Sequence, residues 1–282
     1  MDFQKGVTVF IDQQVKIDRD RVLINNGSMN PDSREMDDVL YEKGAFIPKD
    51  NWRSLSDTES SMIMNNEKPK YPYESIQILK MDKACMSLFE KIGCLDVRVY
   101  HDWEQLSHHP KYNDTIEQSL HYINKYLMKG SFARPLGIGY SYPNVPGTTQ
   151  YIQKSDAQKL NQYFGLHVDV FDNMPIPFAH RARNRLCMNL SLEDRYLVYN
   201  NVPVDFIPKF LDVDKKCYPQ TAKETKGLAR KFMKKYPNYP LVKVKIKHGE
   251  AYIAPTEHII HDGYSIGKKY LDIFLTYLGF FI

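Results

Sequence analysis

The chain has 282 residues, of which 43% are hydrophobic and 26% are charged, and its formal net charge is +4. These ordinary values exclude a wholly disordered chain, and the mild positive charge does not by itself indicate nucleic-acid binding. No apolar run reaches the roughly 18 residues of a membrane helix, and the N-terminus does not resemble a signal peptide. We therefore expect a cytoplasmic protein whose four cysteines are reduced thiols.

The first 130 residues are predicted to form a region of helices and loops. Near the start, Val7 to Ile11 and Arg21 to Asn25 have the apolar character of strands. The segment from Asn25 to Tyr73 is poor in apolar runs and rich in turn residues. A long irregular stretch of this kind is typical of a lid or a binding loop.

Two helices and one strand are predicted next. Apolar residues at helical spacing predict a helix over 74–93, with Gly93 as its end. The run VRVYH at 97–101 is typical of a strand. A second helix is predicted over 114–130, with Asp114 as its cap.

From residue 131 onwards, short β-type runs alternate with Gly, Pro and Asn, and one helix is predicted at 221–236. This spacing is typical of an antiparallel sandwich or barrel. We predict an α+β, mainly β fold in a single domain over 1–282, with an N-terminal helix and loop region at 1–130 and a β-core at 131–282. The predicted strands are IGYSY, TTQYI, GLHVDVF, RLCMNLSL, YLVYNNV, LVKVKIK, EAYIAPT, HIIHDG and LDIFLTYL.

The sequence His167-Val168-Asp169 is the first candidate for chemistry. Side chains two residues apart on a strand point to the same face, so this imidazole and carboxylate can reach one metal ion. The pattern is short, and a hydrogen-bonded surface pair is the alternative interpretation.

A second candidate begins at Gly249-Glu250 and ends at His261-Asp262-Gly263. His261 lies at a predicted strand end beside a turn glycine, where a side chain faces a cavity. It would complete a set of two histidines and one carboxylate, which leaves positions open on Fe(II) for oxygen chemistry. His258 lies on the opposite strand face, and for either histidine a core side chain bonded to a carbonyl is the alternative.

The order of these motifs over roughly 131–282 resembles the Fe(II)/2-oxoglutarate-dependent dioxygenases. The resemblance implies a double-stranded β-helix (jelly-roll) core in which His167, Asp169 and His261 bind Fe(II). It also implies 2-oxoglutarate as co-substrate and O2 as oxidant. The carboxylate of Asp169 favours hydroxylation, desaturation or cyclisation, because halogenating relatives carry a small residue in its place.

One feature of that family is missing, because no arginine follows Arg230 to bind the far carboxylate of 2-oxoglutarate. The candidates for this role are Arg195, at the start of a predicted strand, then Lys268, downstream of His261, and Arg185. Lysine neutralises a carboxylate without the forked geometry of arginine. The alternative for the arginines is ion pairing with Glu193, Asp194 or Asp172.

The prediction for function is an oxygenase of a small metabolite such as an amino acid or a natural-product intermediate, with no nucleic-acid or membrane partner. The 20 tyrosines suit an aromatic pocket. Two alternatives stay open. A non-catalytic jelly-roll binding protein is favoured by the missing downstream arginine. A metal-dependent hydrolase using His261-Asp262 is disfavoured, since that class needs helices there. The oligomeric state is not predicted.

Overall fold

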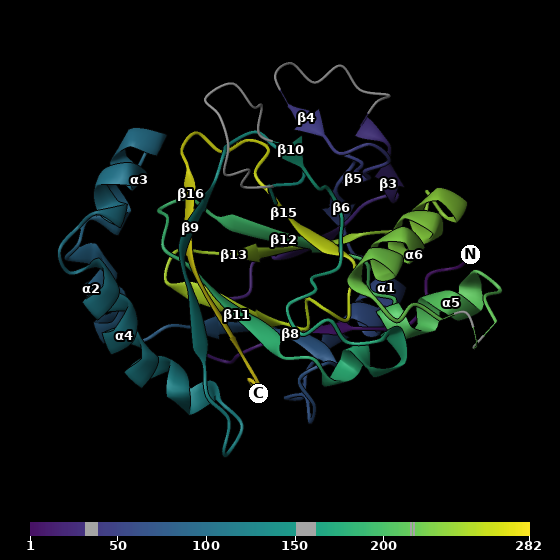
Figure 1. Cartoon of the computed structure of the whole chain (residues 1–282), viewed down its shortest axis with the longest axis horizontal. Helices are drawn as coiled ribbons and strands as arrows, with labels where there is room; N and C mark the ends of the chain where they lie inside the picture. Colours follow the sequence, from purple (N-terminus) through teal and green to yellow (C-terminus); the bar gives the residue numbers. More distant parts are fainter. Residues whose placement is uncertain (32–38, 151–161, 215, 217) are drawn as a thin grey trace.

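The computed structural model describes residues 1–31, 39–150, 162–214, 216 and 218–282. Its centre is a pair of facing β-sheets, with helices on both outer sides (Figure 1). The fold is thus mixed α and β, with most of its core made of sheet.

The larger sheet has seven strands, and β1 runs parallel to both of its neighbours while the other pairs are antiparallel. In spatial order the strands are β7 (Met64–Asn65), β1 (Thr8–Ile11), β8 (Ser75–Lys80), β14 (Glu250–Ala254), β11 (Asn184–Asn189), β16 (Asp272–Gly279) and β9 (Arg134–Ser141).

The smaller sheet has five antiparallel strands, and two short pairs lie outside both sheets. Its strands in order are β15 (His261–Tyr264), β12 (Arg195–Tyr199), β13 (Val242–Ile246), β2 (Val22–Ile24) and β6 (Arg53–Ser54). The two short pairs are β10 (Gln162–Tyr163) with β4 (Leu40–Tyr41), and β3 (Ser28–Met29) with β5 (Ile47–Pro48).

The core lies between the two sheets. Val9, Ile78 and Tyr252 of the larger sheet pack in one buried cluster with Leu197 and Val244 of the smaller sheet. Full burial of each large apolar side chain contributes about 1.5–3 kcal/mol. This apolar layer holds the sheets face to face and fixes the strand ends around the site described below.

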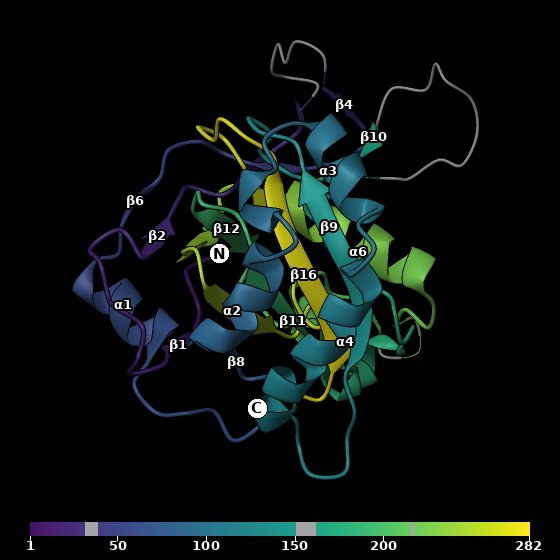
Figure 2. The ribbon, with the colours of Figure 1, turned by 90° about the vertical axis from the view of Figure 1, so that its left-hand side faces the viewer.

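Helices cover the outer face of each sheet. On the larger sheet, α2 (Lys83–Glu90), α3 (Tyr100–Ser107) and α4 (Tyr112–Ile123) lie over β16 and β9 (Figure 2). On the smaller sheet, α6 (Ala222–Lys235) packs through the fully buried Phe232. No helix in the described part of the chain is long and apolar enough to cross a membrane. The remaining helical segments are α1 (Asp57–Ile63), α5 (Ile207–Phe210), η2 (Cys94–Asp96), η3 (Asn124–Tyr126), η4 (Ile176–Arg181) and η5 (Val204–Phe206).

Several N-terminal predictions were wrong. Residues 75–80 of the predicted 74–93 helix form β8, which is buried between β1 and β14, and an apolar run buried on both faces does not distinguish strand from helix. The predicted strand at 97–101 is not formed. Residues 97–99 lead into α3, which begins at Tyr100, because the Asp102 carboxylate accepts bonds from the backbone N–H groups of Arg98 and Val99.

The expected loop region from Asn25 to Tyr73 contains five short strands and α1 within its described residues. Ile47 and Ile63 are fully buried there. Residue 130 also does not divide helices from sheet, since β1 and β8 belong to the larger sheet and β2 to the smaller one.

The C-terminal predictions agree more closely with the structure. The runs IGYSY, RLCMNLSL, YLVYNNV, LVKVKIK, EAYIAPT and LDIFLTYL contain or overlap β9, β11, β12, β13, β14 and β16, and HIIHDG reaches the start of β15. GLHVDVF is not a strand, because its pairing is limited to an isolated bridge at His167. Residues 151 and 152 of TTQYI lie outside the described residues.

Candidate metal centre

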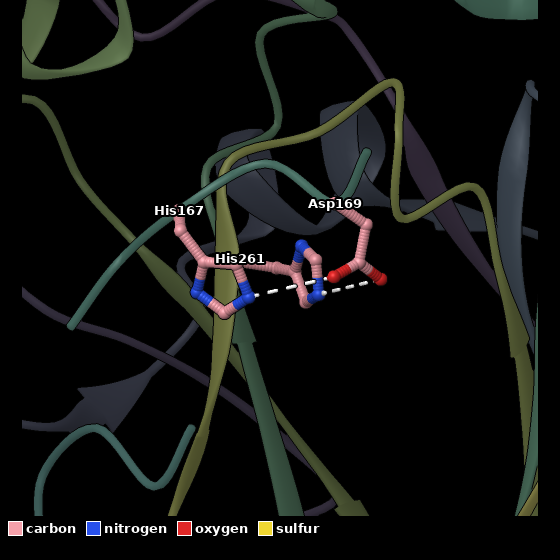
Figure 3. A group of neighbouring side chains, drawn as sticks. All are labelled: His167, Asp169 and His261. Atoms are coloured by element: carbon pink, nitrogen blue, oxygen red, sulfur yellow. Dashed lines mark ion pairs between the residues drawn. The ribbon is translucent and has the colours of Figure 1, made fainter. Parts of the chain in front are cut away.

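His167, Asp169 and His261 meet where the segment after β10 crosses the start of β15 (Figure 3). The backbones of His167 and His261 exchange two hydrogen bonds, of 3.0 and 2.7 Å, and the N–H of Asp169 donates to the carbonyl of Thr256. Backbone pairing therefore fixes His261 beside His167 and Asp169, from which it is distant in sequence.

The ligand atoms of these three residues all lie within 4.8 Å of one another. Nε2 of His167 is 3.5 Å from one oxygen of Asp169, and Nε2 of His261 is 3.7 Å from the other (Figure 3). The exposed fractions of the side chains are 11% for His167, 9% for Asp169 and 3% for His261. The cluster is therefore largely shielded from solvent.

Backbone carbonyls orient both imidazoles. Nδ1 of His167 donates to the carbonyl of Gly165 at 2.8 Å, and Nδ1 of His261 donates to that of Ile259 at 3.3 Å. These bonds select the tautomer that leaves each Nε2 lone pair available. Gly165 has φ +66° and its Cβ position would lie 2.4 Å from the carbonyl oxygen of Phe46, so this turn requires glycine.

The charge states of His261 and Asp169 suit a bound cation. Burial lowers the pKa of His261 to about 3, so its imidazole is neutral. Burial opposes ionisation of Asp169, but Arg185 and the two histidines outweigh it and hold the pKa of this carboxyl well below its usual range. For His167, burial acts to lower the pKa. The opposing effect of Asp169 and Asp262 is larger, so the pKa of this imidazole is raised.

Arg185 on β11 is an immediate neighbour of this cluster. Its Nη2 lies 2.6 Å from the Asp169 oxygen that faces His261. Loss of one partner from a buried ion pair is strongly destabilising, so Arg185 holds the Asp169 carboxylate in place. Asp169 is not one of the three acids that the sequence offered as partners for the arginines, which were Glu193, Asp194 and Asp172. Of those three, Asp172 pairs with Arg183.

Arg195 and Lys268 share one acid. Both form ion pairs with Asp272, at the start of β16, and Lys268 Nζ is 2.8 Å from its Oδ1. The three side chains are buried and carry a net charge of +1. The guanidinium of Arg195 also lies 3.9 Å from the ring centroid of Phe274.

One cavity, of about 380 Å³, is lined both by His261 and by two of the arginines. Its lining includes His261, Arg185, Arg195 and Tyr252, and Trp103 and Tyr140 belong to it as well. Lys268 is not among its described lining residues. The cavity therefore brings His261 together with Arg185 and Arg195, two of the three cationic side chains predicted to bind the far carboxylate of 2-oxoglutarate.

His258 and Asp262 have other surroundings. His258 Nε2 bonds to Asp205 at 2.9 Å, and the group within 4.8 Å does not include it. Asp262, considered from sequence as a hydrolase ligand, accepts bonds through Oδ1 from the N–H groups of Thr148 and Thr149, and its Oδ2 lies 3.9 Å from Nδ1 of His167.

Tyr252 was not identified from sequence, and Asp262 was considered there only as a hydrolase ligand. Asp262 ties the cavity-lining segment at Thr148 and Thr149 to β15, and Tyr252 lies opposite Cys187 across the β11–β14 pair. The adjacency of Asp262 to His261 was visible in the sequence, but its partners were not. Burial raises the pKa of Tyr252, so its phenol stays protonated and can donate a hydrogen bond.

No family model matches the chain, and no curated protein matches it. Among solved structures, it is similar to the Kdo hydroxylase KdoO, a non-heme Fe(II) alphaketoglutarate dependent dioxygenase. The complex with alphaketoglutarate and Fe(III) has 12% identity and a TM-score of 0.40, and the match covers 73% of this chain and 79% of that chain. The apo structure has 13% identity, the same coverage and a TM-score of 0.40. Because these values are low, the proposal below rests on the geometry of the site.

Proposed function

We propose that the chain is an Fe(II)- and 2-oxoglutarate-dependent oxygenase with a jelly-roll core, and that His167, Asp169 and His261 hold the iron. The observation that supports it is the cluster of three ligand atoms within 4.8 Å, with His261 lining a cavity that also contains two arginines. Metal, co-substrate and substrate would then meet in one enclosed space.

The donor set fits Fe(II), because two imidazoles and one carboxylate leave coordination positions open. His261 is neutral and Asp169 is ionised, so neither has to change its charge state before binding a cation. With bound 2-oxoglutarate, Fe(II) would supply the activation of O2 that oxidises a substrate C–H bond. Arg185 would retain one carboxylate oxygen of Asp169 and leave the other for the metal.

Arg195 is the proposed anchor for the far carboxylate of 2-oxoglutarate. It lines the cavity, and its Nε has no hydrogen-bond partner among the described residues. Lys268 shares Asp272 with Arg195, so it offsets the acid and leaves the guanidinium its positive charge. Tyr252 would donate a hydrogen bond from its phenol to this far carboxylate. Arg185 would face the keto-acid end of 2-oxoglutarate, beside the metal.

The rest of the cavity would accept a small substrate. Trp103 and Tyr140 offer aromatic faces, and Thr148, Thr149 and Gln150 offer polar groups. A small metabolite such as an amino acid or natural-product intermediate is the proposed substrate, with hydroxylation, desaturation or cyclisation as outcome. The chain's own task is to orient this molecule toward the metal and to exclude water from the reaction.

The test is an anaerobic titration of the whole chain with Fe(II), followed by 2-oxoglutarate. We expect one ion at this centre and a visible charge-transfer band that depends on 2-oxoglutarate, because the keto-acid chelates the metal. His261→Ala should abolish the band, whereas the matched variant His258→Ala should retain it. Absence of the band in the wild-type protein loaded with iron would refute the co-substrate and favour the binding-protein alternative.

A further inference from the structure

A second cavity, of about 740 Å³, lies outside the proposed oxygenase site. It is formed by the N-terminal segment around Val7, by Tyr73 and by the connections that carry His180, Asp205 and His258. None of its described lining residues belongs to the 380 Å³ cavity at His261. This second cavity is therefore a separate space from the one beside the proposed iron centre.

The centre of this second site is the carboxylate of Asp205, which lies between two imidazoles. Nε2 of His258 is 2.9 Å from Oδ1 of Asp205, and Nδ1 of His180 is 3.8 Å from Oδ2. The ring of Tyr73 stands edge-on to both imidazoles, with centroids 5.4 Å from His180 and 5.9 Å from His258. Thus η4, which carries His180, and the β14–β15 connection, which carries His258, converge on the acid of η5.

The His258 half of the cluster is rigid. The backbone N–H of Val204 donates to the carbonyl of His258 at 2.9 Å, and the N–H of His258 donates to Pro255 at 2.8 Å. The His258 side chain is 5% exposed, and its Nδ1 has no hydrogen-bond partner among the described residues. Leaving this buried nitrogen without a partner costs about 1–3 kcal/mol, so the backbone bonds and the Nε2 bond to Asp205 hold the imidazole in place against that cost.

The His180 half can adjust. As placed, the His180 and His258 ring centroids are 6.2 Å apart, and Nδ1 of His180 is still 3.8 Å from the nearer oxygen of Asp205, so His180 must turn toward His258 for both to reach one ion. The His180 side chain is 31% exposed at the cavity wall, which leaves it room to rotate. Imidazole and carboxylate donors together suit divalent transition metals, and the cavity has space for further ligands such as water.

Charge supports a cation at this position. Within the described ranges, the ion-pair partners of Asp205 are these two histidines, and no lysine or arginine pairs with it. A metal ion would bind in place of the hydrogen that lies between the Asp205 carboxylate and the His258 imidazole. We propose that His180, Asp205 and His258 form a second binding site for a divalent transition-metal ion, independent of the proposed oxygenase centre.

The experiment separates the two centres by removing the first. In the full chain, His167→Ala/His261→Ala eliminates two ligands of the proposed iron site, and Co²⁺ or Zn²⁺ is titrated with calorimetry and the visible spectrum of Co²⁺ as readouts. We expect two ions in the wild-type protein and one in this double variant. Adding His258→Ala or His180→Ala should remove the remaining ion.

His121→Ala, which removes an exposed histidine from α4, is the matched control and should leave the count unchanged. Asp205→Asn keeps the side-chain shape but removes the charge, so it tests the site if the alanine variants fold poorly. Binding of no ion by a folded double variant, or of an ion that survives loss of His258 and of Asp205, overturns the proposal. Either result would leave the proposed oxygenase centre untouched.

Discussion

At the residue scale, the three clustered side chains make the most direct prediction. His167→Ala, Asp169→Ala and His261→Ala should each abolish turnover and weaken Fe(II) binding, because each removes one donor from the group within 4.8 Å. The fold should persist, since no large apolar side chain is lost, but Asp169→Ala should lower the free energy of unfolding because it leaves Arg185 without its ion-pair partner. Fe(II) titration and circular dichroism of each variant measure the two effects. His258→Ala should be milder, and loss of iron binding at the proposed centre in that variant alone would identify His258 as the distal ligand.

Arg195 carries the second prediction. Arg195→Met should raise the apparent KM for 2-oxoglutarate by roughly 10- to 100-fold, the loss expected from one charge-assisted pair of about 1.5–3 kcal/mol. Iron affinity should change little, since Arg195 pairs with Asp272 and not with the metal cluster.

Lys268→Met should raise the same KM less, because Lys268 contacts Asp272 and not the cavity. Arg183→Met is the control, since Arg183 pairs with Asp172. A larger effect at Lys268 than at Arg195 would reverse their proposed roles.

Arg185 should behave differently from Arg195, because it contacts Asp169 at 2.6 Å. Arg185→Met leaves the Asp169 carboxylate without this partner, so both the iron affinity and the KM for 2-oxoglutarate should worsen together. Arg185→Lys keeps the charge and should recover part of each. If Arg185→Met changed neither quantity, the ion pair would have no part in the site.

At the scale of elements, the turn before His167 decides where that ligand lies. Gly165→Ala should lower the free energy of unfolding by about 1–3 kcal/mol, because the residue has φ +66° and the new Cβ would lie 2.4 Å from a backbone oxygen of Phe46. Iron affinity should fall as well, since the turn accepts the His167 Nδ1 bond.

Gly130→Ala is the matched control for this turn. Gly130 also has a positive φ, of 83°, but no atom lies within 4 Å of its Cβ position. Gly130→Ala should lower the free energy of unfolding because of its positive φ, but it should leave the affinity for Fe(II) unchanged. Denaturant unfolding and Fe(II) titration of both variants provide the comparison, and equal iron affinities would contradict the role given to Gly165.

At the scale of the whole molecule, stability should depend on Glu257. Burial raises the pKa of this carboxyl from 4.5 to about 7. A carboxyl whose pKa is higher in the folded protein favours folding in its neutral form, so this contribution is complete below pH 4.5 and is lost as the pH rises through 7.

Glu257→Gln should therefore increase the free energy of unfolding above pH 7 by about 1–2 kcal/mol, since the glutamine side chain stays neutral at every pH. The glutamine oxygen can still accept the N–H of Asp172. Denaturant unfolding of both proteins between pH 4 and pH 8 measures the difference. A wild-type curve that does not fall relative to the variant over this range would contradict the assignment.

The local pattern of the sequence determined a good part of this protein. Alternation and turn residues located β9, β11 to β14 and β16, because strand periodicity and chain reversal are properties of neighbouring residues. The spacing of His167 and Asp169, with His261 beside a turn glycine, picked out the three side chains that the structure brings together. That they bind iron stays a prediction.

Tertiary structure alone decided the rest. The 75–80 segment became a strand because β1 and β14 pair with both of its edges and apolar clusters bury both of its faces, which no local periodicity records. The partners of Arg185 and Arg195 could not be predicted either. Each pair depends on sheet positions that bring together Arg185 with Asp169 and Arg195 with Asp272. The cluster of His180, Asp205 and His258 has the same origin, since three separate connections meet at one carboxylate only after the two sheets have packed.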